Sequence, residues 1–204
     1  MLQPEDYDFI SNFSTLWAVF LGAILATVGG FAATQIEWFF ERRRRERNAA
    51  LFFGEVLSTL TVLLRIANDT RGRGDPYGPL TMRILRTARR EIDIYDRNRE
   101  SLLDLRDSDI RARIHTLTLR IAMPIDNIFD ATQELSVVLN QLRSNTLTDA
   151  EKAELEGRVA TIRTSRDSGF DFAIEEAESL QTIIAKLEPI ARASFKNIET
   201  IART

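Results

Sequence analysis

The stretch that decides the fold is residues 16–34, LWAVFLGAILATVGGFAAT, which contains no charged side chain. As an α-helix, these nineteen residues would be about 28 Å long, close to the thickness of the hydrocarbon core of a bilayer. Trp17 lies at one end and the WFF run of residues 38–40 beyond the other, where bulky rings favour the headgroup level. The stretch therefore predicts a transmembrane helix, which we assign to residues 14–40.

The charges on the two sides of this segment predict its orientation. Residues 1–13 carry acidic side chains and neither lysine nor arginine, whereas residues 41–47 read ERRRRER. Because arginine is retained on the cytosolic side during insertion, we expect a short acidic extracytoplasmic tail and a cytosolic C-terminal domain. The positive n-region of a cleaved signal peptide is missing, so the anchor is expected to remain. The other reading of the apolar run is a buried helix of a soluble protein.

Basic residues also indicate the compartment and a lipid contact. Of the 27 basic residues only three are lysines, as in GC-rich bacterial genomes, so we expect the inner (plasma) membrane of a bacterium. The run beside the anchor determines topology and can attract anionic lipid headgroups. Its members are Arg42, Arg43, Arg44, Arg45 and Arg47.

Small residues recur at every fourth position of the anchor. They are Ala18, Gly22, Ala26, Gly30 and Thr34. Transmembrane helices associate where small side chains let their backbones approach, so this stripe predicts a homo-oligomer. The competing interpretation is that glycine and alanine are common in membrane helices in any case.

Composition narrows the functional classes. A net charge of −3 argues against a broad nucleic-acid surface, and no nucleic-acid partner is expected. The chain has no cysteine, which excludes disulfides, thiol catalysis and cysteine-ligated metals. With 44% hydrophobic and 28% charged residues, the rest of the chain should be folded.

After the arginines, residues 41–70 predict a basic juxtamembrane segment and an amphipathic helix. Apolar side chains fall at helical spacing from Leu51 to Leu64, and the anchor helix can continue into them without a break. The alternative is a second membrane helix over residues 49–64, with the arginines in the turn of a hairpin. Glu55 would then lie in the apolar span, at a cost of roughly 2 to 3 kcal/mol.

Residues 71–204 predict a cytosolic helical bundle. The segment 71–79 contains glycine and proline and is expected to be a loop, with Pro79 as the first residue of a helix that breaks near Asn98. One face of that helix is apolar. It comprises Leu80, Ile84, Ala88, Ile92 and Tyr95.

Two longer helices follow. The first should start with Ser108 as N-cap, kink at Pro124 and end near Leu142. The second should start at the capping box formed by Thr148 and Glu151. Its near-heptad stripe runs to Ile201, with breaks expected at Gly169 and Pro189. We therefore predict an all-α fold, with one N-terminal transmembrane helix and a cytosolic antiparallel bundle of coiled-coil-like long helices.

Evidence for catalysis is thin, and neither an enzyme nor a cofactor or metal is expected. Two acidic sets at helical spacing could form a carboxylate site, although such spacing is usually a solvated face. They are Asp126, Asp130 and Glu134, and Asp171, Glu175 and Glu178. His115, the single histidine, is interpreted as a packing residue.

The most suggestive cluster is basic and could hold an anion, an anionic lipid surface or an acidic partner. It comprises Arg71, Arg73, Arg83, Arg86, Arg90 and Arg97. Nearby Glu91, Asp93 and Asp96 can neutralise much of it. Our first functional hypothesis is a non-enzymatic interaction or scaffold role, with the bundle contacting a cytosolic protein or another copy. The alternative is a membrane sensor or effector gated by a nucleotide or phospholipid on these arginines.

Overall fold

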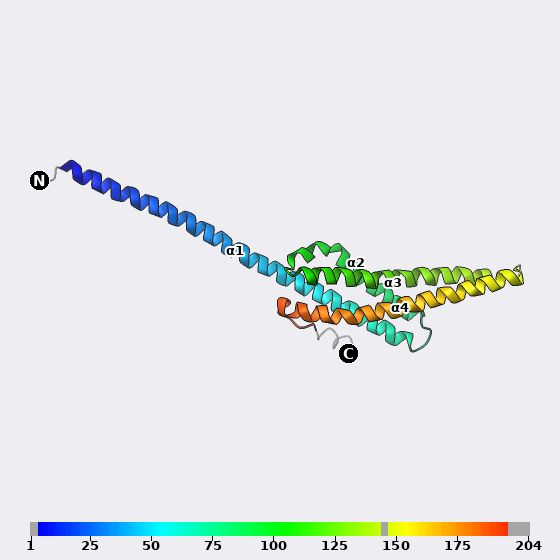
Figure 1. Ribbon diagram of the computed structural model, residues 1–204. Helices are drawn as coiled ribbons and strands as arrows, with labels where there is room; N and C mark the ends of the chain where they lie inside the picture. Colours follow the sequence, from blue (N-terminus) through cyan, green and yellow to red (C-terminus); the bar gives the residue numbers. More distant parts are fainter. Residues whose placement is uncertain (1–3, 144–146, 196–204) are drawn as a thin grey trace. The chain divides into compact units, whose positions relative to one another are not determined.

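The computed structural model describes residues 4–143 and 147–195, with side chains from residue 17 onward. Every regular element in these ranges is helical, which confirms the all-α prediction (Figure 1). The elements are α1 (Pro4–Arg71), α2 (Pro79–Arg97), the 3-10 helix η1 (Arg99–Asp104), α3 (Ser108–Leu142) and α4 (Asp149–Ala191). The chain divides into two compact units, residues 1–45 and 46–204. The segment expected over residues 41–70 lies on both sides of that boundary.

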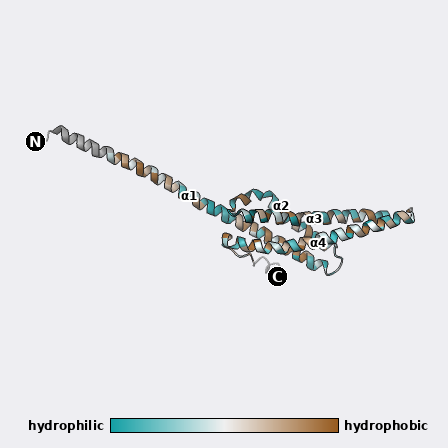
Figure 2. Ribbon diagram, viewed as in Figure 1, coloured by the Kyte–Doolittle hydropathy of each residue, from teal (hydrophilic) through white to brown (hydrophobic). Residues whose placement is uncertain are grey.

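The first unit is helical from Pro4 onward, and its side chains from Trp17 to Arg45 are exposed. Figure 2 shows a band of hydrophobic residues along this part of α1. Of the described helices, α1 alone is long and apolar enough to cross a membrane, with a mean hydropathy of 1.8 over its most apolar window.

Helix α1 passes through residues 41–47 without a turn. This continuity confirms that the anchor helix runs directly into the amphipathic segment, and it contradicts the alternative hairpin with the arginines in its turn. From Ala49 to Ala67, α1 buries one face in the second unit, where Phe53, Leu57 and Leu64 are fully buried.

The core of the second unit is built by all four α-helices. Phe53 of α1 packs edge-on against Tyr95 of α2 at 5.9 Å between ring centres. Helices α3 and α4 contribute Ile114, Ile121 and Phe170, among others. The predicted apolar face of α1 is thus largely buried, and so is one face of α3, since an amphipathic helix is stabilised by packing its apolar stripe.

Helices α3 and α4 extend beyond this core and form a second, smaller hydrophobic cluster. It consists of Ala131, Leu135, Val138, Val159 and Ile162. Ion pairs join the two helices along their length. They link Asp109 with Lys186, Arg120 with Glu176, and Glu134 with Arg158. Successive contacts along α3 therefore meet progressively earlier residues of α4.

Helix ends agree with the sequence at several points. Helix α2 begins at Pro79, Asn98 ends it, and Thr148 and Glu151 form the predicted capping box. The prediction for the N-cap of α3 is wrong by one residue. The N-cap is Asp107, whose side chain accepts hydrogen bonds from the backbone N–H groups of Asp109 and Ile110. A carboxylate one position earlier takes the role expected of Ser108.

Three further predictions are wrong or fall outside the described residues. Helix α4 continues through Gly169 and Pro189, where breaks were expected, because packing on the core outweighs their low helix propensity. Leu80 is 58% exposed rather than part of the buried face of α2. The last stripe residue, Ile201, lies outside the described residues.

Candidate interaction surfaces

The small-residue stripe of the anchor lies on an open helix surface. A Cβ atom added at Gly22 or Gly30 would meet nothing within 4 Å. The hydroxyl of Thr34 donates to the carbonyl of Gly30 at 3.0 Å, so its hydrogen bond stays within the helix. The stripe thus presents small side chains whose polar groups are already satisfied.

The juxtamembrane arginines make several kinds of contact, one of which is the ion pair of Arg45 with Glu41 one turn earlier. Arg42 and Arg43 each lie over an aromatic ring one turn earlier, those of Trp38 at 5.2 Å and Phe39 at 4.6 Å. Such pairing of guanidinium with aromatic rings suits the headgroup level of a bilayer. Arg47 instead donates from Nε to the carbonyl of Ala191 at 3.1 Å, which satisfies the end of α4.

Three of the predicted anion-binding residues form an exposed line on α2, here called the arginine stripe: Arg83, Arg86 and Arg90. Their guanidinium groups make no ion pair or hydrogen bond to any described residue. The neighbouring Arg89 differs, because it binds Asp126 at 2.8 Å and Asp93 at 2.6 Å. These bonds raise the pKa of Arg89 although burial alone would lower it.

The other members of the predicted cluster lie apart from the stripe. Arg97 donates from Nε to the backbone carbonyl of Asp93 at 3.2 Å, and Arg73 is exposed in the loop before α2. Arg71 turns towards α4 instead. The six arginines predicted from the sequence therefore do not form one site.

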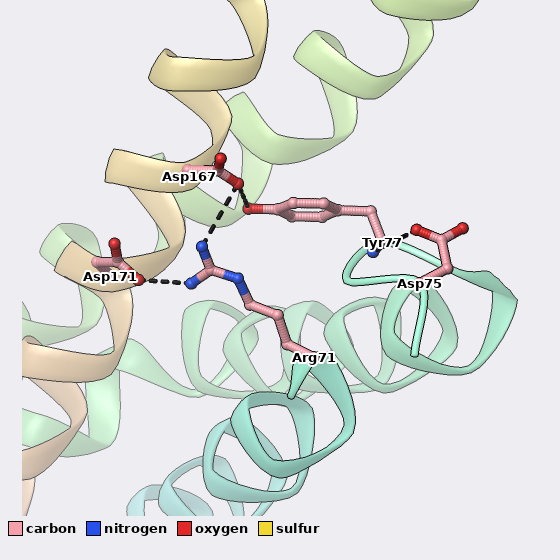
Figure 3. Close-up of polar contacts among 5 residues, drawn as sticks. All are labelled: Arg71, Asp75, Tyr77, Asp167 and Asp171. Carbon is pink, nitrogen blue, oxygen red and sulfur yellow. Dashed lines mark hydrogen bonds and ion pairs between the residues drawn. The ribbon is translucent and has the colours of Figure 1, made fainter. Parts of the chain in front are cut away.

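Arg71 belongs to a polar cluster that fastens the loop after α1 to α4, here called the loop clasp (Figure 3). Its guanidinium binds Asp171 at 2.5 Å and Asp167 at 3.4 Å. The hydroxyl of Tyr77 donates to the same Asp167 at 2.6 Å, and the backbone N–H of Tyr77 donates to Asp75 at 3.1 Å. One carboxylate of α4 thus joins the end of α1 to the loop.

Aromatic contacts complete the loop clasp. Arg166 lies over the Tyr77 ring at 3.6 Å, and Arg71 lies over Phe170 at 4.6 Å. Burial raises the pKa of the Tyr77 hydroxyl, and its hydrogen bond to the Asp167 carboxylate raises it further. The Tyr77 hydroxyl therefore stays protonated and donates its hydrogen bond throughout the physiological pH range. The loop clasp thus joins α1, the loop and α4 through stable polar contacts.

The two predicted carboxylate sets do not meet in one site. Asp126, Glu134 and Asp171 bind three different arginines, namely Arg89, Arg158 and Arg71. The remaining members, Asp130, Glu175 and Glu178, are exposed and make no ion pair to a described residue. In the part of the chain that the structure describes, no group of three histidine or acidic side chains is arranged to hold a metal ion.

His115 lies beside the core, as its sequence context suggested. Its Nδ1 is 3.1 Å from the hydroxyl of Tyr95, a residue of α2 whose ring is fully buried. Burial raises the pKa of Tyr95 to about 12. The contact therefore links α2 with α3, and no acidic side chain in the described ranges pairs with the imidazole.

Surface hollows lie elsewhere on the second unit. One of about 430 Å³ follows the seam between α3 and α4 and is lined by Thr116, Arg120 and Thr182, among others. Beside it Arg120 forms a 2.6 Å ion pair with Glu176, a buried carboxylate. Others of about 450 and 180 Å³ lie beside η1 and between α1 and α4. The arginine stripe lines none of these three.

Comparison with known proteins adds no further constraint on the site. No protein family, curated protein or solved structure matches the chain.

Proposed function

We propose that the protein is a single-pass protein of a bacterial inner membrane with a non-enzymatic interaction or scaffold role. Its N-terminus lies on the extracytoplasmic side of that membrane, and its antiparallel helical bundle, with coiled-coil-like long helices, lies in the cytosol. The protein associates with copies of itself through the anchor and offers a bundle face to a protein partner.

The observation that carries this proposal is the surface of the first unit. Large apolar side chains such as Leu25 and Phe31 are 70% and 67% exposed on α1, over a length that matches a bilayer. Exposing these apolar side chains to water would be unfavourable, whereas contact with the hydrocarbon core of a bilayer would not. The open face at Gly22 and Gly30 then suits contact with a second anchor, since helices in lipid associate by close packing.

Self-association is tested with the full-length protein in a bacterial membrane two-hybrid assay. We expect the triple variant Gly22→Leu, Ala26→Leu and Gly30→Leu to lose most of the signal, because added side chains separate the helix backbones. The matched control alters large side chains away from the stripe: Ile24→Leu, Val28→Leu and Phe31→Leu. Equal signals from wild type and the stripe variant would refute association through this face.

A second candidate function rests on the exposed arginine stripe. An anionic ligand, either a nucleotide or a phospholipid, would bind there and change the arrangement of the bundle, which requires different affinities for two states. Thermal unfolding of the detergent-solubilised protein with a panel of nucleotides and phospholipids tests this. The sensor proposal predicts stabilisation that Arg86→Ala removes, whereas the scaffold proposal predicts no stabilisation.

A further inference from the structure

The arginine stripe has a regular geometry along α2. Its members are separated by three and then four residues, so they lie on one helix face and span about 10 Å of axis. The opposite face of α2 is buried, with Leu85 and Ile92 in the core. The stripe is thus a line of three positive charges on one helix, none of which pairs with a side chain that the structure describes.

An acidic line of the same length lies on α4. Asp171, Glu175 and Glu178 are separated by four and then three residues and are exposed. Glu175 and Glu178 make no ion pair to a described residue, and Asp171 keeps 70% of its side chain exposed although it binds Arg71. We call this line the acidic face.

Helices α2 and α4 run in the same direction within the second unit, because both return along α1. Tyr77 and Asp167 meet near the end of α1, whereas Glu46 contacts Arg106 and Arg47 contacts Ala191. Two bundles held the same way up on one bilayer therefore bring α2 and α4 together in parallel. Both lines span seven residues, so Arg83 would then oppose Asp171, Arg86 would oppose Glu175 within one residue, and Arg90 would oppose Glu178. We propose that the arginine stripe of one copy binds the acidic face of a second copy in this register.

Within one chain, the two lines do not neutralise each other. Helix α2 packs on α3 and η1, and no ion pair among the described residues joins Arg83, Arg86 or Arg90 to the acidic face. Both lines therefore stay open to another copy. Charge complementarity between two faces of the same chain favours a second copy over a lipid surface, which would leave the acidic face without a partner.

The strength of this contact depends on the proposed membrane anchoring and self-association, on which the inference rests. Exposed ion pairs are individually weak and are screened by salt. Tethering in one bilayer and association of the anchors raise the effective concentration of one bundle near another. The contact should therefore form in membranes and weaken as ionic strength rises.

Site-directed cross-linking tests the register directly, because the chain has no cysteine of its own. Full-length Arg86→Cys and Glu175→Cys variants, carrying different tags, are co-expressed and oxidised in isolated membranes. We expect a disulfide-linked dimer that carries both tags and becomes several-fold weaker in 1 M salt. The matched control pairs Arg86→Cys with Glu154→Cys, another exposed glutamate of α4, and should give little product.

Charge exchange then separates direct pairing from a general loss of structure. In the cysteine pair, Arg90→Glu in the first copy should reduce the cross-linked product several-fold. Glu178→Arg in the second copy should restore it, since the opposing charges are then exchanged. A reduction without restoration would overturn the register.

The remaining outcomes are also decisive. A product no stronger than that of the Glu154→Cys control overturns the proposed contact. If the two tags still co-purify in that case, self-association stands and only this contact fails; if they do not, the proposed self-association fails as well. A fluorophore at residue 86 that responds to phosphatidylglycerol rather than phosphatidylcholine nanodiscs, without cross-linking, would instead assign the stripe to lipid.

Discussion

The two halves of α1 carry similar apolar side chains but meet different surroundings. From Trp17 to Phe40 the large apolar residues are exposed all round the helix, whereas from Ala49 to Ala67 one face is buried and Glu55 and Arg65 lie outside it. Uniform apolarity over a bilayer's width points to lipid as solvent, and a periodic stripe points to protein packing. Periodicity, more than apolar content, distinguishes the two environments.

The same substitution in each half gives the largest expected contrast. Leu57→Ala empties a fully buried position and should destabilise the second unit by about 2 to 5 kcal/mol. Leu25→Ala should leave that unit unchanged, because Leu25 is 70% exposed and lies in the other unit. Unfolding of the detergent-solubilised protein, followed by circular dichroism, measures both. Equal effects would contradict the division of α1 into two environments.

Gly54 sharpens the description of the packed half. A Cβ atom at this position would lie 2.0 Å from the ring of Phe195, which packs against α1. Gly54→Ala should therefore cost about 1 to 3 kcal/mol through overpacking. Gly157→Ala is the matched control: nothing lies within 4 Å there, and alanine should stabilise α4 by about 0.5 to 1 kcal/mol. Stabilisation by both would show that Phe195 does not pack on Gly54.

The loop clasp should contribute less than the core. Tyr77→Phe removes the hydrogen bond to Asp167 but keeps the ring against Phe170, so we expect a loss of about 0.5 to 1.5 kcal/mol. Denaturant unfolding at pH 7 measures it. Tyr7→Phe, in the N-terminal segment outside the second unit, is the matched control and should leave the stability of that unit unchanged.

The smallest effect concerns Glu91, whose pKa burial raises above its ordinary value of 4.5. Burial disfavours the ionised carboxylate, so ionised Glu91 lowers the stability of the fold. This loss of stability is present above the folded-state pKa and disappears below 4.5, where the group is protonated in both states. Glu91→Gln should therefore be slightly more stable than wild type at pH 7 and equal to it at pH 4. Melting temperatures across this range provide the check, and a gap that widens at low pH would reverse the assigned cause.

Helical periodicity predicted the all-α class, the continuity of α1 and most helix ends, because local spacing and capping residues determine these features. It failed at Gly169 and Pro189, where tertiary packing keeps α4 helical despite poor local propensity. The cap of α3 was displaced because two adjacent residues, Asp107 and Ser108, can both serve as caps.

The loop clasp was not predicted, because its partners are about 90 to 100 residues apart in the sequence. The only signal in the sequence was the spacing of Asp167 and Asp171, one turn apart on α4. Nothing in the sequence indicated that the loop after α1 would lie against them. The separation of Arg71 from the other five arginines likewise depended on the carboxylates that α4 presents to it. Spacing along one helix defines a face but not its tertiary partners.

The account depends most on lipid being the surroundings of residues 17–40. The direct measurement is fractionation of cells that express the tagged full-length protein, followed by an alkaline carbonate wash of the membranes. We predict that the protein stays in the washed membrane pellet and is released by detergent. Recovery of the intact chain in the soluble fraction without detergent would contradict the account.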